Sequence, residues 1–166
     1  MANVYLCLGS NLGDRRQQLI DAIVHLSEKA GTIPAFSSFH ESPPWGYSSP
    51  RLFLNVAVHL VTPLLPVELL AVTQQIERSL GRIAKSNTDQ YTDRLIDIDI
   101  LLYDDAVLQT PDLIIPHPLM HERLFTLQPL AEIAPAIIHP VMHQPVSELL
   151  QSALSHAANS SNTCLL

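Results

Sequence analysis

Two aspartates one residue apart stand in a short apolar segment, and they are the side chains of this sequence best suited to chemistry. Asp97 and Asp99 alternate with Ile96, Ile98 and Ile100, as in a β-strand. Successive strand side chains point to opposite faces, so both carboxylates share one face, with Cα atoms roughly 6.5 Å apart. Carboxylates that close repel each other, and hard divalent cations suit them best. The pair suggests a two-metal site; the alternative is an exposed face with two solvated aspartates.

The segments that must position this pair alternate between strand and helix patterns. Apolar runs bounded by turn residues predict strands at 4–8, 33–40, 53–61 and 94–103. One helical pattern starts at the N-cap candidate Asp14 and stops at Gly31, and a second spans 66–80. The isoleucines give the strand at 94–103 an apolar second face, which predicts a central place in the sheet. Further helices are expected at 127–133 and 146–156.

This order of elements predicts an α+β protein. Strand, helix, two strands, helix and strand form the β-α-β-β-α-β pattern of a ferredoxin-like sandwich, an antiparallel sheet with helices packed on it. A length of 166 residues suits one domain. We expect that domain to span 1–156, with 157–166 as a disordered tail because its residues are small and polar.

Composition argues against several functional classes. The net charge of −7 is unfavourable for non-specific nucleic-acid binding. No run approaches the roughly 18 apolar residues that a membrane span needs. Cys7 and Cys164 are the only cysteines and indicate no disulfide framework. No signal-peptide pattern is visible, so we expect a cytoplasmic monomer that binds small molecules, with no nucleic-acid or membrane partner.

A proline-rich loop and an unusual strand asparagine suggest a flat ligand. The loop at 41–50 carries Trp45 and Tyr47, and aromatic rings there suit stacking on a heterocycle. The alternative is that Trp45 simply packs onto the core. In the next strand, Asn55 shares a face with Phe53, and its amide both donates and accepts, which suits a purine- or pterin-like edge. The polar loop at 82–93 has the length of a functional lid and leads directly into the aspartate strand.

Two further patterns favour structural interpretations. The glycines at 9 and 13 precede a helix as in a phosphate-binding loop, but the Lys-Ser/Thr ending is missing, so a tight strand-to-helix turn is preferred. Two histidine pairs have a spacing of four residues: His117 with His121, and His139 with His143. The zinc-protease signature requires Glu after the first histidine, whereas both pairs have proline there. Zinc therefore ranks last among the hypotheses.

Taken together and in this order, the motifs resemble the 6-hydroxymethyl-7,8-dihydropterin pyrophosphokinase family of folate biosynthesis. The matching stretches are 8–13, 42–46, 53–55, 74–82, 94–100, 115–117 and 123–125. Each is weak alone, but the ordered set covers nearly the whole chain. The resemblance implies that the chain transfers the β,γ-pyrophosphoryl group of ATP to the pterin hydroxymethyl group and releases AMP.

The resemblance also implies a set of site residues. Asp97 and Asp99 would bind two Mg²⁺ ions, and Arg82 and Arg94 would act with them in catalysis. The implied ATP-binding residues are Gln74, Glu77, Arg82, Arg94, Ile98, His117 and Arg123. The implied pterin-binding residues are Ser42, Pro43, Pro44, Trp45, Gly46, Phe53, Asn55 and Phe125. In this arrangement the pterin ring lies between the two phenylalanines, and Asn55 reads its edge.

The sequence departs from the family pattern in the predicted lid. Many members carry a second arginine two residues after Arg82, where this chain has Ala84 with Lys85 beside it. Lysine supplies a point charge but no bidentate fork. This departure motivates the alternative of a non-catalytic ferredoxin-like module that binds nucleotide and pterin without reaction.

Overall fold

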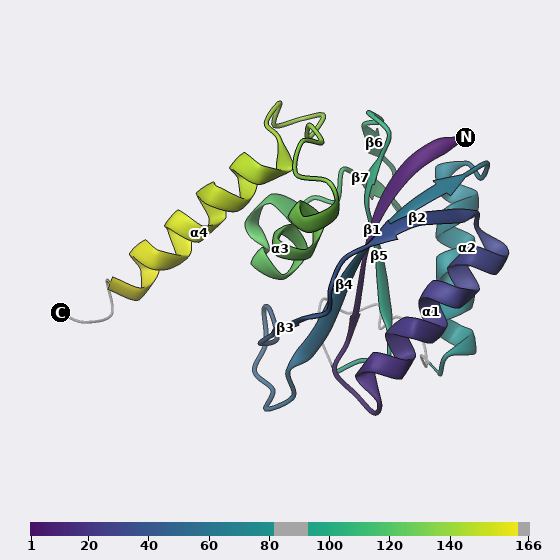
Figure 1. Cartoon of the computed structure of the whole chain (residues 1–166), viewed down its shortest axis with the longest axis horizontal. Helices are drawn as coiled ribbons and strands as arrows, with labels where there is room; N and C mark the ends of the chain where they lie inside the picture. Colours follow the sequence, from purple (N-terminus) through teal and green to yellow (C-terminus); the bar gives the residue numbers. More distant parts are fainter. Residues whose placement is uncertain (82–92, 163–166) are drawn as a thin grey trace.

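An antiparallel sheet with helices on both faces organises the chain (Figure 1). The computed structural model describes residues 1–81 and 93–162, so most of the predicted lid, with Arg82, lies outside the described residues. The principal elements are β1 (Ala2–Ser10), α1 (Arg15–Lys29), β2 (Thr32–Phe36), β3 (His40–Ser42), β4 (Phe53–Thr62), α2 (Pro66–Ser79), β5 (Asp97–Tyr103), α3 (Leu124–Ile133) and α4 (Val146–Asn162). Two short strands, β6 (Leu108–Gln109) and β7 (Ile114–Ile115), pair with each other, and a 3-10 turn, η1 (Met120–Glu122), precedes α3.

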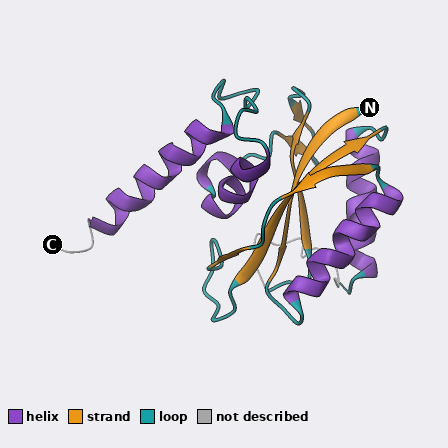
Figure 2. Cartoon of the chain, viewed as in Figure 1, coloured by secondary structure: helices purple, strands orange, loops and turns teal. Residues whose placement is uncertain are grey.

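The strand order is β2-β4-β1-β5. Strand β3 also pairs with β4, at residues 53–55, next to the part of β4 that pairs with β2. All of these pairs are antiparallel. The order and the two crossover helices confirm the predicted ferredoxin-like α+β sandwich (Figure 2).

The prediction that the aspartate strand is central was wrong. Among the described strands, β5 pairs only with β1 and forms an edge of the sheet. Its isoleucines are nevertheless buried, because α2 packs against β5 and covers that face. An apolar face requires a cover above it, not a partner strand on each side.

The strand predicted at 33–40 is divided into β2 and β3. Ser37 causes the division: its backbone N–H donates to Ala57 O, and its hydroxyl accepts from Ala57 N–H, both at 2.9 Å. A side chain thus takes the place of a backbone partner at this point of the ladder. Pairing with β4 resumes at His40, which lies opposite Asn55.

The two faces of the sheet differ in their cover. On one face, α1 and α2 lie over a continuous apolar core that contains Leu6, Val58 and Ile100. On the other face, α3 covers one half with a second cluster that includes Cys7, Leu101 and Leu127. The alternation predicted for β4 is confirmed, since Val56, Val58 and Leu60 join the first cluster and Ala57 the second.

Helix α4 packs against α3 with Val146 and Leu149 and then projects away from the sheet (Figure 1). It continues to Asn162, beyond the predicted end at 156, so the prediction of a disordered tail was wrong for residues 157–162. Residues 157–162 carry no apolar stripe, which is why periodicity missed them, although alanine is a strong helix former. Within the described part of the chain, no helix combines the length and apolar character that crossing a membrane requires.

Candidate active site

A cleft opens on the half of the sheet that α3 leaves uncovered. Its walls come from β1, β4, β5, the loop after β3 and the start of α3, and its space is about 530 Å³ including the open mouth. The lining residues are Cys7, Gly9, Ser42, Pro43, Trp45, Tyr47, Phe53, Asn55, Arg94, Asp97, Asp99, Arg123 and Phe125. Segments far apart in the sequence therefore meet around one small-molecule-sized space.

Asp97 and Asp99 both line the cleft, which confirms that they share a face of β5. Across the ladder they lie beside the small residues Gly9 and Cys7 of β1. Arg94 Nη1 lies 2.7 Å from Asp97 Oδ2, and both side chains are about one-fifth exposed. A partly desolvated ion pair of this kind is stronger than a surface pair. This end of the cleft therefore combines two acids with a fixed guanidinium.

Asn55 lies on the other side of β1 from the aspartates, because Gly9 pairs with Asn55 on one side and with Asp97 on the other. It is almost fully buried, and its Nδ2 donates to Ser42 Oγ at 2.8 Å and to His40 O at 3.2 Å. The amide is thereby fixed in orientation before any ligand arrives. Phe53 lies two residues earlier on the same face of β4 and also lines the cleft. An aromatic ring beside an oriented amide can bind a flat heterocycle by its face and its edge.

Arg123 closes the aromatic wall. Its guanidinium carbon lies 4.3 Å from the ring centroid of Trp45 and 5.6 Å from that of Phe125. Both distances are within the range of cation–π attraction. The residue is 6% exposed, so its charge lies in the wall and not in solvent. Arg123 joins the loop of Trp45 to the start of α3.

His117 lies near the charged end as a neutral side chain. Burial, and then the charge of Arg123, lower the pKa of His117 to about 4, although Asp97 acts in the opposite direction. Its Nδ1 accepts a hydrogen bond from Leu119 N–H at 3.3 Å. Because Nδ1 accepts, the ring proton is on Nε2. At neutral pH, His117 therefore offers an uncharged N–H donor.

Asn11 ties the rim of the cleft together. Its backbone N–H donates to Arg94 O at 3.0 Å, and its Oδ1 accepts from Arg94 N–H at 2.6 Å. Its Nδ2 donates to Asp93 Oδ1, Tyr47 OH and Arg51 O. The strand-to-helix turn predicted at Gly9–Arg15 thus has a second role, because it fixes the segment that carries Arg94. Arg51 also pairs with Asp93, at 2.9 Å.

Several predicted residues lie outside the cleft lining, namely Pro44, Gly46, Gln74, Glu77, Ile98 and His117. Glu77 is buried on α2, and its Oε1 accepts from Ile98 N–H at 2.8 Å, so it anchors the edge strand to the helix. Conversely, the sequence prediction missed Cys7 and Gly9 in the lining, whereas Tyr47, which also lines the cleft, was named as an aromatic residue of the loop. The signal for the first two was the run Tyr5, Cys7, Gly9, in which one face of β1 narrows to small side chains. Burial, followed by the charge of Asp99, raises the pKa of the Cys7 thiol, which therefore stays protonated.

The aspartate pair fits magnesium better than zinc. Within residues 1–81 and 93–162, no three His, Cys, Asp or Glu side chains gather as a metal cluster. Mg²⁺ is commonly held by one or two carboxylates, with waters and substrate phosphates completing its shell. Zinc requires three or four protein ligands. His139 uses its Nδ1 lone pair to accept from Val141 and Met142 N–H groups, so its proton is on Nε2 and no lone pair faces a metal.

Comparisons with known proteins agree with this chemistry. The family model for 7,8-dihydro-6-hydroxymethylpterin-pyrophosphokinase (HPPK) matches residues 5–135. The 2-amino-4-hydroxy-6-hydroxymethyldihydropteridine pyrophosphokinase of Porphyromonas gingivalis is 48% identical over 146 residues, which cover 87% of this chain and 99% of that protein. The protein of the same name from Aquifex aeolicus is 43% identical over 148 residues, 89% of this chain and 90% of that one.

A solved structure shows the same fold. The HPPK-DHPS protein of Plasmodium falciparum, crystallised with pteroate, superposes with a TM-score of 0.77 over 97% of this chain. The two are 18% identical, and this chain spans 44% of the length of that one. The likeness therefore extends to the sheet and its helices.

Proposed function

The chain belongs to the 7,8-dihydro-6-hydroxymethylpterin-pyrophosphokinase family, and we propose how its side chains divide the reaction between the two ends of the cleft. The chain transfers the pyrophosphoryl group of ATP to hydroxymethylpterin, a step of folate synthesis. One observation carries our assignment: a single cleft is lined by both ring-binding and charged side chains. Two substrates held in one cleft react as an oriented pair, which removes much of the entropic cost of their encounter.

The aromatic end is assigned to the pterin. Its ring lies between Phe53 and Phe125, and its amide-like edge meets Asn55. The hydrogen bonds that Asn55 makes to Ser42 and His40 support this role, because they orient the amide in advance. Pro43 and Trp45 form the loop wall, and Pro44 and Gly46, beside them in the loop, remain predicted pterin contacts. A site that hydrogen-bonds a heterocycle edge strongly rejects analogues that lack the matching groups.

The charged end is assigned to the triphosphate. Asp97 and Asp99 hold two Mg²⁺ ions that, when bound with ATP, supply charge neutralisation and Lewis acidity. Arg94 donates to phosphate oxygens, and its ion pair with Asp97 supports this by fixing the guanidinium at the cleft. Arg82 is expected to do the same from outside the described residues. Gln74, Glu77, Ile98, His117 and Arg123 remain the predicted nucleotide contacts.

The reaction needs positioning more than covalent chemistry by the protein. The pterin hydroxyl oxygen attacks the β-phosphorus, the bond from that phosphorus to the α,β-bridging oxygen breaks, and the hydroxyl proton passes to water. AMP leaves with the bridging oxygen. Arg94 and the Nε2–H group of His117 are suited to stabilise negative charge that grows on the phosphate oxygens. Fixed donors need no reorganisation as that charge develops.

A product assay tests the proposal. Purified protein with ATP, Mg²⁺ and 6-hydroxymethyl-7,8-dihydropterin is expected to release AMP and the pterin diphosphate, both measured by anion-exchange chromatography. Formation of ADP would contradict attack at the β-phosphorus. Binding of both substrates without any AMP would favour the non-catalytic module. Because the chain is expected to act as a monomer in the cytoplasm, light scattering during gel filtration should give one chain per particle.

A further inference from the structure

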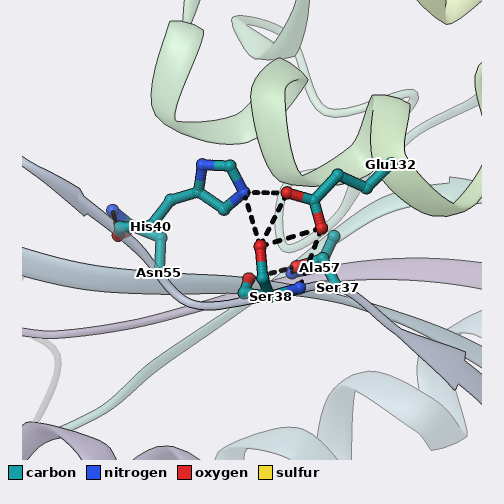
Figure 3. A network of polar contacts seen from close by, with 6 residues as sticks. All are labelled: Ser37, Ser38, His40, Asn55, Ala57 and Glu132. Atoms are coloured by element: carbon teal, nitrogen blue, oxygen red, sulfur yellow. Dashed lines mark hydrogen bonds and ion pairs between the residues drawn. The ribbon is translucent and has the colours of Figure 1, made fainter.

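A polar cluster outside the cleft joins α3 to the edge of the sheet (Figure 3). Ser38 belongs to the link between β2 and β3, His40 opens β3, and Glu132 lies near the end of α3. Ser38 Oγ donates to Glu132 Oε1 at 2.7 Å, and Ser38 N–H donates to Oε2 at 2.8 Å. His40 Nε2 forms a hydrogen bond with Glu132 Oε1 and lies 3.3 Å from Ser38 Oγ. One carboxylate thus receives hydrogen bonds from a side chain and a main-chain group of β2–β3 and from the imidazole.

The geometry of this cluster excludes a serine-hydrolase triad. In such a triad, the serine and the acid meet opposite nitrogens of the histidine ring. Here both contact the same nitrogen, Nε2. A carboxylate only accepts, so that nitrogen carries the hydrogen and cannot act as a base toward Ser38. Partial burial would raise the pKa of Glu132, but the hydrogen bonds from Ser38 and His40 lower it below its ordinary value. The Glu132 carboxylate is therefore ionised, and its hydrogen bonds to Ser38 and His40 form a tie between α3 and the β2–β3 segment.

The tie connects the two walls of the aromatic end of the cleft. Along β3, His40 and Ser42 are two residues apart and point to the same face. Asn55 Nδ2 donates to His40 O and Ser42 Oγ, so the position of β3 fixes the orientation of the amide that faces the cleft. Phe125, which also lines the cleft, belongs to the first turn of α3, and Glu132 lies near the other end of the same helix.

Apolar packing alone does not fix this separation. Helix α3 packs on the sheet through Leu127 and Leu130, whose apolar contacts are non-directional. Its first turn also hydrogen-bonds to β1, through the side chains of Thr126 and Cys7. Strand β3 has three residues and pairs with β4. Among the described residues, directional hydrogen bonds from Ser38 and His40 to Glu132 hold the end of α3 to β3 and to the link that precedes it.

We propose that Ser38, His40 and Glu132 are positioning residues that set the width of the pterin end of the cleft. They hold Phe125 at the distance from Asn55 and Ser42 at which one flat ring fits. The inference rests on the assignment of the pterin to Phe53, Asn55 and Phe125. It predicts that loss of the tie weakens pterin binding and leaves nucleotide binding unchanged.

Glu132→Ala tests the proposal against a matched control, Glu28→Ala. Glu28 also pairs with a histidine, His25, but on α1 beneath the other face. We expect Glu132→Ala to raise the Kd for 6-hydroxymethylpterin, measured by calorimetry, about three- to tenfold, the loss of a part-exposed charged hydrogen-bond set. The Kd for a non-hydrolysable ATP analogue should change less than twofold, and Glu28→Ala should change neither value.

Milder variants protect the test against misfolding. Ser38→Ala should weaken pterin binding in the same direction, and His40→Gln, which keeps a donor, should retain more affinity than His40→Ala. A drop in melting temperature with an unchanged pterin Kd would overturn the proposal, as would equal weakening of both ligands. Calorimetry needs no turnover. A protein that binds pterin but makes no AMP would therefore refute the proposed reaction, and its pterin Kd values would still test whether the tie positions the cleft.

Discussion

The two faces of the sheet are built by the same strands yet have opposite character. Beneath α1 and α2, side chains such as Leu6, Leu60 and Ile98 are almost completely buried in one apolar layer. On the other face of the same strands, Asp97, Asp99 and Asn55 surround a cleft. Holding two like charges close together costs free energy, and apolar burial on the closed face contributes stability that offsets this cost. The apolar core of the closed face thus stabilises a fold in which the open face holds its charges close together.

The strongest test of this division is Asp99→Asn. On our assignment it removes a ligand of Mg²⁺ and a source of charge stabilisation, so kcat should fall by about 10³-fold. Folding should not suffer, because one of two neighbouring like charges disappears. Rates of AMP release and melting temperature measure the two effects. Asp105→Asn, in the exposed turn after the strand, is the matched control and should behave as wild type. The comparison would fail if Asp99→Asn lowered the free energy of unfolding by more than it raised the activation free energy of the reaction.

Leu6→Ala makes the opposite change, on the closed face. Leu6 is fully buried, so its truncation should lower the free energy of unfolding by about 2–5 kcal/mol. Below the melting transition, the folded fraction should keep its kcat. Urea unfolding followed by fluorescence gives the stability, and Val107→Ala, at a site that is 65% exposed, should change it by less than about 0.5 kcal/mol. Inactive but folded Leu6→Ala protein would show that the closed face does more than support.

Gly9→Ala narrows the cleft by one methyl group. A Cβ at this position would lie 3.1 Å from Asn55 Oδ1 and 3.4 Å from Phe53 Cδ1. Asn55 is fixed by two hydrogen bonds and cannot easily withdraw. We expect the KM for the pterin to rise about tenfold, a cost of roughly 1.4 kcal/mol, with little change for ATP. Cys7→Ala, which enlarges the same wall, serves as the contrast and should not reproduce this pattern.

Asp93→Asn has the smallest expected effect and depends on pH. Partial burial would raise the pKa of Asp93, but hydrogen bonds led by that from Arg51 lower it to about 2. The folded-state pKa lies below the unfolded value, so Asp93 stabilises the protein above about pH 4, and this contribution disappears as the pH falls toward 2. The variant should be less stable at pH 7 by no more than about 1 kcal/mol. The gap in stability between the variant and the wild type, measured by unfolding curves, should be smaller at pH 3 than at pH 7; a gap that stays constant would contradict the ionic origin.

The sequence was sufficient for those features that depend on local periodicity. Alternation placed Asp97 with Asp99, and Phe53 with Asn55, on shared faces, and the order of elements predicted the antiparallel α+β sandwich. Asp14 was also identified correctly as an N-cap, since its Oδ1 accepts from Gln17 N–H at 3.1 Å. These are relations between residues a few positions apart, for which strand and helix geometry alone is decisive.

Features that depend on distant contacts could not be predicted in this way. The tie of Glu132 to Ser38 joins residues 94 positions apart, and nothing in either local pattern indicates the other. The edge position of β5 likewise follows from how the strands assemble, because an alternating apolar face looks the same at an edge or in the middle. The small residues of β1 indicated open space beside that strand, but the sequence did not show that Asn55 borders this space.

The edge strand has a consequence for behaviour at high concentration. An open β-edge invites a second chain to continue the ladder, which is a common route to aggregation. Along β5, the carboxylate of Glu77 caps the amide of Ile98, and the amide of His117 caps the carbonyl of Leu101. These two caps interrupt the edge within four residues, too short a gap for an intruding strand to pair stably. The same contacts that hold the acidic strand in place thus also protect the protein from self-templated polymerisation.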